Sequence, residues 1–177
     1  MPMRATKKLT LSAMATALGC ALMAPGAVWE MADLACAALA ALVMIVIMIE
    51  VRGFYPFLVW ISTTLLSFLL FISLASPIWV MYLVMGIYPI LKFYIEKLKR
   101  PLWIPLKLVY STVAIFGLVL AVELIFAIPL VESEYLPVKI AFYALFLVAF
   151  MMYDRVVTVA ARFYTYKLRN RFKNLFK

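Results

Sequence analysis

Residues 7–21 read KKLTLSAMATALGCA, an apolar stretch with small side chains at steps of three and four residues. In a helix this spacing gathers small residues on one face. That face consists of Ser12, Ala13, Thr16, Ala17, Cys20 and Ala21. Lipid does not drive apolar helices together as water does, so membrane helices associate largely through close van der Waals approach, which small side chains permit. The stretch therefore predicts a membrane helix with a thin face, in contact either with the protein's own helices or with another subunit.

The composition of the chain excludes a soluble globular domain. Of the 177 residues, 68% are hydrophobic and 14% are charged, and the mean hydropathy is +1.09. This leaves too little polar sequence to cover a water-facing surface. The apolar runs are long and unbroken, which is typical of helices that need about 20 residues to cross a bilayer rather than of barrel strands. We therefore expect an all-α membrane protein.

Charges and prolines divide the chain into six apolar runs. The expected spans cover about 9–24, 31–49, 55–74, 77–91, 104–129 and 137–154. We expect them to form one bundle, a single transmembrane domain that ends in a basic amphipathic tail over residues 155–177. Pro89 falls inside the fourth run and predicts a kink or a stop there.

The distribution of charge predicts the orientation in the membrane. Of the 17 Lys and Arg residues, all except Lys139 fall on one side of the expected spans. Four acids gather on the other side, namely Glu30, Asp33, Glu132 and Glu134. The positive-inside rule then places both termini in the cytoplasm. The net charge of +9 is thus explained by topology and by anionic lipid at the cytoplasmic face, rather than by nucleic acid.

Two of the cytoplasmic segments suit the lipid headgroup layer. Residues 92–103 mix basic and aromatic side chains, and residues 164–177 repeat apolar side chains at helical spacing, with basic ones clustered apart from them. We expect the second segment to lie as a helix in the inner headgroup layer. The alternative for both segments is a positive-inside anchor without a specific partner.

The start of the chain also resembles a secretory signal peptide, with basic residues before a short apolar core and an Ala-rich end near Ala27. A thin face for helix contact would serve no purpose in a segment that is removed. We therefore interpret the first run as a membrane span.

The sequence argues against catalysis and against metal binding. It contains no histidine, no Gly-rich phosphate loop and no Gly-x-Ser-x-Gly turn. Cys20 and Cys36 lie in apolar runs and lack the spacing of a zinc site. We expect neither an enzyme nor a bound metal or cofactor, so that any ATP hydrolysis belongs to another chain.

Polar and aromatic side chains concentrate in the predicted outer half. Glu123 lies within the fifth run, where an ionisable group is costly and usually faces a cavity or a partner. Its alternative is a structural pairing, for example with Lys139. The candidate substrate-binding residues are Glu123, Glu30, Asp33, Trp79, Tyr82, Lys139 and Tyr143. For the two rings at outer helix ends, Trp79 and Tyr82, the alternative is the aromatic belt of the membrane interface, and for Glu30 and Asp33 it is a solvated loop.

The basic lead RATKKLTLSA (residues 4–13), the alanines Ala13, Ala17 and Ala21, and six short spans with both termini inside resemble the S component of energy-coupling factor vitamin transporters. In that family the alanine face of the first helix docks on a transmembrane coupling subunit, which binds two ATPases. The resemblance implies docking through these alanines and an outward pocket for a small solute, in which Glu30, Glu123 and Tyr143 would converge. It also implies a bacterial cell membrane. The first external loop, about residues 25–30, is shorter than the family's pattern.

Size and number of spans also resemble MreD-like scaffold proteins of bacterial cell-shape machinery. Such a scaffold would use the same thin face and basic edge to hold partners, without a substrate. A binding protein should have an enclosed outer pocket lined by Glu123 and polar neighbours, whereas a scaffold should fill that space with apolar side chains. A channel is disfavoured because no span carries a regular polar stripe.

Overall fold

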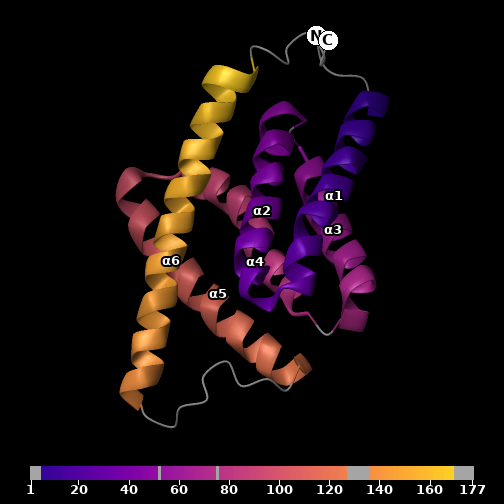
Figure 1. Cartoon of the computed structure of the whole chain (residues 1–177). Helices are drawn as coiled ribbons and strands as arrows, with labels where there is room; N and C mark the ends of the chain where they lie inside the picture. The colour runs from indigo at the N-terminus through magenta and orange to yellow at the C-terminus, as the bar shows by residue number, and fades with distance from the viewer. Residues whose placement is uncertain (1–4, 52, 75, 127–135, 170–177) are drawn as a thin grey trace. The chain divides into compact units, whose positions relative to one another are not determined.

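The computed structural model describes residues 5–51, 53–74, 76–126 and 136–169, which are almost entirely helical and contain no strand. Six helices in these ranges are long and apolar enough to cross a membrane, which indicates a multi-pass membrane protein. They are α1 (Ala5–Val28), α2 (Asp33–Glu50), α3 (Tyr55–Phe71), α4 (Ile78–Ile95), α5 (Trp103–Phe126) and α6 (Leu136–Phe163) (Figure 1). The expected all-α class with six long apolar helices is confirmed, while the orientation of the termini stays a prediction.

Local signals account for several helix boundaries. Pro56 lies in the first turn of α3, where a missing N–H costs no helical hydrogen bond. Gly53 has a φ of +76° in the turn between α2 and α3, a left-handed conformation that favours glycine. Pro89 lies inside α4, but the helix continues to Ile95, so the alternative of a stop at Pro89 was wrong.

The last helix is longer than expected. α6 runs from Leu136 to Phe163, and a π-helical turn, Tyr164–Leu168, follows it directly. We expected a span ending near residue 154 and a separate basic tail. The described part of that tail, residues 155–169, instead continues the helix, because Val156, Val157 and Val159 keep it apolar beyond Asp154 and Arg155. The remainder of the expected interfacial helix, residues 170–177, lies outside the described residues.

The chain forms two compact units. Unit 1 comprises Met1–Ile90 and Val156–Lys177, and unit 2 comprises Leu91–Arg155. The prediction of one six-helix bundle concerns how the two units sit together, and it stays a prediction.

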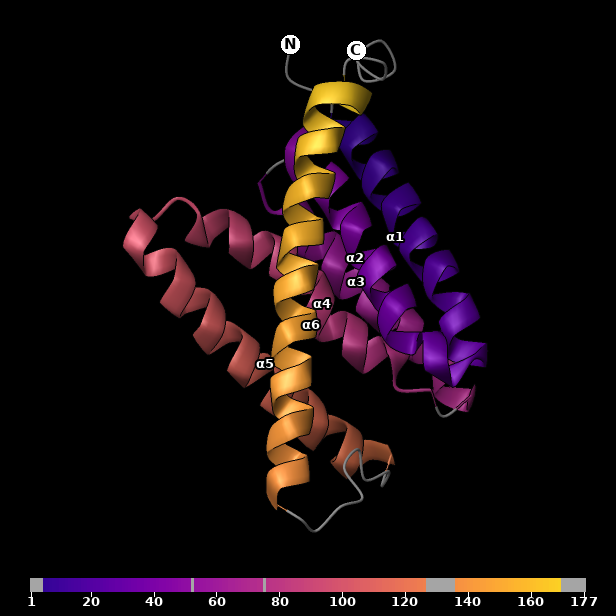
Figure 2. The same ribbon diagram turned by 60° about the vertical axis from the view of Figure 1, so that its left-hand side comes forward.

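The core of unit 1 lies among α1, α2 and α3, which run side by side (Figure 2). Its centre is a cluster of buried side chains from these helices and the end of α4, made up of Ala15, Met44, Ile47, Val51, Val59 and Ile90. Two glycines let α1 approach its neighbours. A Cβ on Gly19 would lie 3.0 Å from the Thr63 side chain of α3, and one on Gly26 would lie 2.9 Å from Cys36 of α2. Small side chains on α1 therefore determine how closely the three helices approach.

α4 packs on α3 largely through aromatic side chains. The Trp60 indole donates a hydrogen bond to the main-chain oxygen of Leu83 (3.0 Å). The rings of Phe68 and Trp79 meet edge to face, with 5.0 Å between their centroids. Bulky rings on this side leave an open groove between α3 and α4.

Unit 2 contains the last residues of α4, all of α5 and most of α6. The Tyr110 ring of α5 packs against Phe150 of α6, with centroids 5.7 Å apart, and Phe150 packs on Tyr153. Charged side chains of all three helices meet at one end of the unit.

Candidate functional site

Four of the candidate substrate-binding residues belong to unit 1, at the end where α1 finishes and α2 and α4 begin. Asp33 is the first residue of α2 and is buried. Tyr82 in α4 is 1% exposed, and Trp79 one turn earlier is half-buried. Glu30 lies in the short 3-10 turn before α2, and its side chain lies outside the described part of the structure. Asp33 was expected to be a substrate ligand or a solvated loop acid, and its burial excludes the solvated loop.

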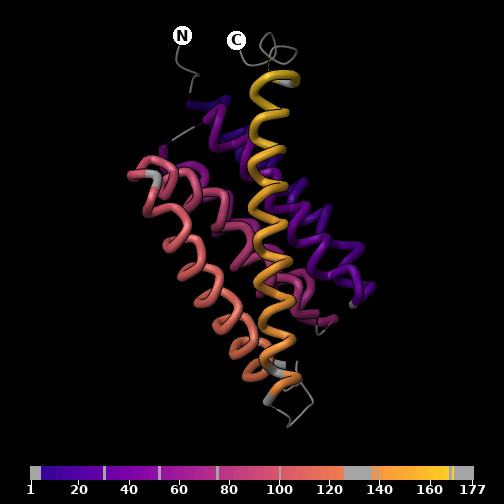
Figure 3. The backbone as a smooth tube through the Cα atoms, turned by 90° about the vertical axis from the view of Figure 1, so that its left-hand side faces the viewer, coloured from indigo at the N-terminus to yellow at the C-terminus, as the bar shows by residue number. Residues whose placement is uncertain are grey.

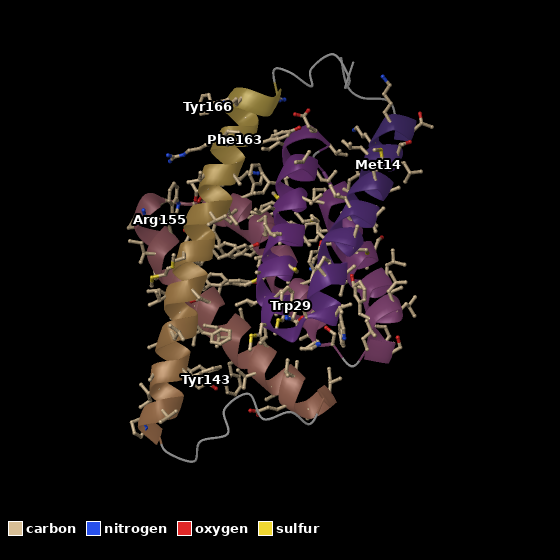
Figure 4. The ribbon with its side chains drawn as sticks, in the orientation of Figure 1. Met14, Trp29, Tyr143, Arg155, Phe163 and Tyr166 are labelled. Atoms are coloured by element: carbon tan, nitrogen blue, oxygen red, sulfur yellow. The ribbon has the colours of Figure 1, made fainter. Side chains whose placement is uncertain are left out.

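The helix ends that carry these residues are close together. A Cβ on Gly26 would lie 2.5 Å from the Ile78 side chain and 3.3 Å from the Asp33 backbone, so the end of α1 touches the starts of both α2 and α4. Trp29, at the same end of α1 (Figure 4), is 73% exposed. Its backbone N–H donates to the carbonyls of Pro25 and Gly26, each at 3.0 Å. The connection after α1 is therefore a tight turn without a long lid, as its short sequence predicted.

The other three candidates belong to unit 2. Glu123 lies in the last turns of α5 and is exposed, and Tyr143 of α6 (Figure 4) is half-buried. Lys139 lies one turn before Tyr143, but its side chain is outside the described part of the chain. A convergence of Glu30, Glu123 and Tyr143 would join residues of both units, and it stays a prediction.

A groove between α3 and α4 in unit 1 contains one of the candidate residues, Trp79. It has a volume of about 290 Å³. Its lining consists of Trp60, Ile61, Thr64, Leu65, Phe68, Trp79 and Leu83. The Thr64 hydroxyl donates to the main-chain oxygen of Trp60 (2.8 Å), and the Trp60 indole donates to Leu83, so the polar groups of these two side chains are already engaged. The groove suits apolar contact, and Glu123 is not part of its lining.

The thin face of α1 divides into two sides. Of the residues expected on this face, Ser12 and Cys20 are buried, as are their neighbours Ala15 and Gly19, on the side that packs against the rest of unit 1. Thr16 is half-buried. Ala13, Ala17 and Ala21 are exposed, as are Leu9, Met14 and Leu18 beside them (Met14 is labelled in Figure 4). The set of small residues expected on one face thus forms two adjacent stripes. One stripe holds the protein's own helices together, and the other carries exposed alanines between larger side chains.

Four charged side chains form a compact network in unit 2. Lys92 of α4 pairs with the carboxylate of Asp154 of α6 and also donates to the Asp154 main-chain oxygen (2.8 Å). Lys107 of α5 lies 3.0 Å from the same carboxylate, and Glu96 lies 3.4 Å from Lys107 and 3.7 Å from Lys92. Two ammonium groups and two carboxylates therefore share one site at no net charge, and the Lys92 side chain is only 5% exposed.

Sequence reasoning missed this network. It counted Lys92 and Lys107 among the basic residues of the cytoplasmic side, and it placed Asp154 at the end of the sixth span. One signal was available, because Lys92 and Glu96 are four residues apart and opposite in charge, which predicts an ion pair on one helical face. The contribution of Asp154 depends on how α6 packs in unit 2, which no local spacing shows.

A buried acid, Glu50, was also missed. Its side chain, at the end of α2, is 8% exposed and lies 3.0 Å from Arg169 Nε. The Tyr164 hydroxyl donates to the same carboxylate oxygen at 3.4 Å. Both partners come from the helical turn after α6, so Glu50 connects α2 to the C-terminal part of unit 1. An acid two residues before Arg52, at the inner end of a span, was the available sequence signal.

The described residues provide little for metal or redox chemistry. No group of three or more His, Cys, Asp or Glu side chains capable of holding a metal ion occurs in the described part of the chain. Cys20 is buried, with its Sγ 3.7 Å from the Ser67 hydroxyl and 3.9 Å from the Thr63 main-chain oxygen. This position fits a small packing residue between α1 and α3.

Comparison with protein-family models, with curated proteins and with solved structures gave no match for this chain.

Proposed function

We propose that this chain is the membrane-embedded substrate-capture subunit of an energy-coupling factor type uptake transporter in a bacterial cell membrane. In this proposal it takes up a small solute, such as a vitamin, from outside the cell. A separate transmembrane coupling subunit and ATPase subunits supply the energy. The six apolar helices and the basic start of α1 agree with such a subunit.

The observation that carries the proposal is the exposed alanine stripe of α1. Ala13, Ala17 and Ala21 leave a shallow strip along the helix, beside the large exposed side chains of Met14 and Leu18. The helix already has a packed side towards α2 and α3, so the exposed alanines are not needed for the core of unit 1. A second membrane helix could approach this strip closely, because alanine keeps the backbones near each other.

The first test is substitution of Ala17 by Trp. The bulky ring would prevent close approach, so we expect A17W to abolish association with the coupling and ATPase subunits while the isolated chain stays folded. The matched control is A35W on α2, because Ala35 is also an exposed alanine of unit 1. The measurement is purification of the complex from native membranes, with circular dichroism of each variant. An A17W chain that still recovers the complex would contradict the docking role.

The second test concerns the solute. In the proposal Glu123 faces a cavity, so Glu123→Ala should weaken the binding of a cationic or hydrogen-bond-donating solute, because the buried end of such a solute would lose its charged partner. Mass spectrometry of small molecules that co-purify with the wild-type chain would identify the solute. Its affinity for wild type and E123A would then be measured by calorimetry. Equal affinities would remove Glu123 from the site.

One observation favours the alternative of an MreD-like scaffold. The groove between α3 and α4, near the predicted outer end, has an apolar lining, as a scaffold without a substrate would have. A scaffold would yield no co-purifying solute and would associate with cell-envelope proteins instead of with ATPases. The same purification therefore distinguishes the two functions.

A further inference from the structure

The turn between α4 and α5, together with its flanking residues, forms a distinct surface of unit 2. We call residues 93–104 the basic–aromatic turn. It contains the last turn of α4, the short 3-10 helix Arg100–Leu102 and the first residues of α5, and the chain reverses direction within it (Figure 3). Backbone hydrogen bonds hold it, among them Lys97 N–H to the Tyr94 carbonyl (3.2 Å) and Leu98 N–H to the Ile95 carbonyl (3.0 Å). The turn is thus a structured surface.

The charges of this region divide into two groups. Lys92 and Lys107 are neutralised within the network by Asp154 and Glu96. Lys97 and Lys99 are exposed, and no carboxylate of the described residues forms a salt bridge with either of them. Both acids of this end are therefore used internally. The turn presents a surplus of positive charge to its surroundings.

The ammonium group of Lys97 is held in place by two aromatic rings. It lies 4.2 Å from the centroid of the Phe93 ring and 5.1 Å from that of Tyr94, both within the range of cation–π attraction. The two rings meet edge to face, with centroids 5.9 Å apart, and are 48% and 50% exposed. Such an ammonium keeps its N–H groups available for an acceptor outside the protein.

Large apolar side chains surround these cations. Leu98 and Leu102 are about half exposed, and Ile104 at the start of α5 is 70% exposed. Exposure of these apolar side chains to water is unfavourable, whereas contact with lipid acyl chains removes them from water. One positioned cation, a second exposed one, a tyrosine hydroxyl and exposed aliphatic groups on one turn match a phosphate with acyl chains attached. A choline headgroup, which adds a positive charge, matches less well.

We propose that the basic–aromatic turn binds the phosphate headgroup of an anionic phospholipid, with Lys97 and Lys99 as its cationic ligands. Phe93 and Tyr94 position the ammonium group of Lys97, and Leu98, Leu102 and Ile104 contact the lipid chains. A positive-inside anchor would need only net charge on one side of the membrane. This site, in contrast, distinguishes anionic from zwitterionic lipid through particular residues.

The test is native mass spectrometry of the full chain in detergent, with equimolar dioleoyl phosphatidylglycerol and dioleoyl phosphatidylcholine. We expect the wild-type chain to retain the anionic lipid preferentially. The double variant K97Q/K99Q should lower this preference by about 25-fold, since each of the two lysines contributes a factor of about five near a membrane surface. Phe93→Leu keeps the apolar contact but removes a ring, and it should lower the preference by a smaller factor.

The matched control is K7Q/K8Q, which removes the same charge from the start of α1 in unit 1. It should retain the wild-type preference. Equal retention of the two lipids by the wild-type chain would overturn the proposal. So would an unchanged preference in K97Q/K99Q, or a loss in K7Q/K8Q as large as that in K97Q/K99Q. None of these outcomes involves the solute or the coupling subunit, so the lipid site stands or falls independently of the proposed function.

Discussion

At the scale of single residues, the carboxylate of Asp154 is the centre of the charge network. It accepts hydrogen bonds from both Lys92 and Lys107, whereas Glu96 lies at longer distances from the same two ammonium groups. Taking one partner from a buried ion pair is costly, because the other charge is left without compensation. The two sides of the network therefore differ in how well they tolerate substitution.

We predict that Asp154→Ala destabilises the chain more than Lys92→Met does. Without Asp154, two ammonium groups share only Glu96, and the loss should be about 3–5 kcal/mol. Without Lys92, the Asp154 carboxylate keeps Lys107 at 3.0 Å, and the loss should be smaller. The measurement is equilibrium unfolding in mixed micelles, followed by helical circular dichroism. The neighbouring Arg155→Met, at an exposed position (Figure 4), serves as the control and should change stability by at most about 0.5 kcal/mol. Equal effects of D154A and K92M would contradict the shared-carboxylate arrangement.

The sequence indicates which residues are charged but not how deeply each one lies. Lys92 and Glu50 read as ordinary interfacial charges, since hydropathy treats a lysine or a glutamate at the end of an apolar run as its boundary. Their burial depends on contacts with residues that are distant in the sequence. Glu50 of α2 contacts Tyr164, and Lys92 of α4 pairs with Asp154. Ala13, Ala17 and Ala21 could be assigned to one face by periodicity alone. Periodicity could not show which side of that face the protein buries.

At the scale of the helices, glycines test the close packing of α1. A Cβ on Gly26 would meet the end of the Ile78 side chain at 2.5 Å and Cys36 Cβ at 2.9 Å, so the Ile78 side chain would have to turn aside and the start of α2 would have to move. Gly117 of α5 has no such neighbour within 4 Å among the described residues. The two positions therefore provide a matched pair in which the same added methyl group meets either a packed surface or open space.

We predict that Gly26→Ala destabilises the chain by about 1–3 kcal/mol through overpacking. Gly117→Ala should be neutral or stabilising by up to about 1 kcal/mol, because alanine favours the helix over glycine. The same unfolding measurement in mixed micelles gives both values. A G26A chain as stable as the wild type would mean that α1 does not approach α2 and α4 as closely as described.

The number of long helices could be predicted from hydropathy. A helix that crosses the bilayer needs a length set by the bilayer thickness, and the sequence contains six apolar runs separated by charges or prolines. The end of α6 could not be predicted in this way. Asp154 and Arg155 look like a boundary in the sequence, but valines follow them and the helix continues to Phe163. The stop considered at Pro89 failed for a similar reason, because a proline removes one hydrogen bond without ending a helix that packing supports.

At the scale of the whole molecule, three features lie in different places. The exposed alanine stripe lies on α1, charged groups lie near the predicted cytoplasmic ends of the helices, and the candidate solute site lies near the predicted outer ends. The exposed alanine stripe lies within unit 1 and the basic–aromatic turn within unit 2, so each can be tested separately. The solute site would need residues from both units. Identification of a bound molecule is therefore the most informative test of the solute site.

The proposed function requires that the exposed alanine stripe of α1 receives a separate transmembrane subunit. Site-specific photo-crosslinking in native membranes tests it most directly, with a photoreactive amino acid at Ala13, Ala17 or Ala21 and, as a control, at the exposed Ala35 of α2. We expect each of the three α1 positions to form an adduct with the same transmembrane coupling subunit, and position 35 to form no such adduct. Adducts with lipid alone at Ala13, Ala17 and Ala21, or the same protein adduct from Ala35, would contradict it.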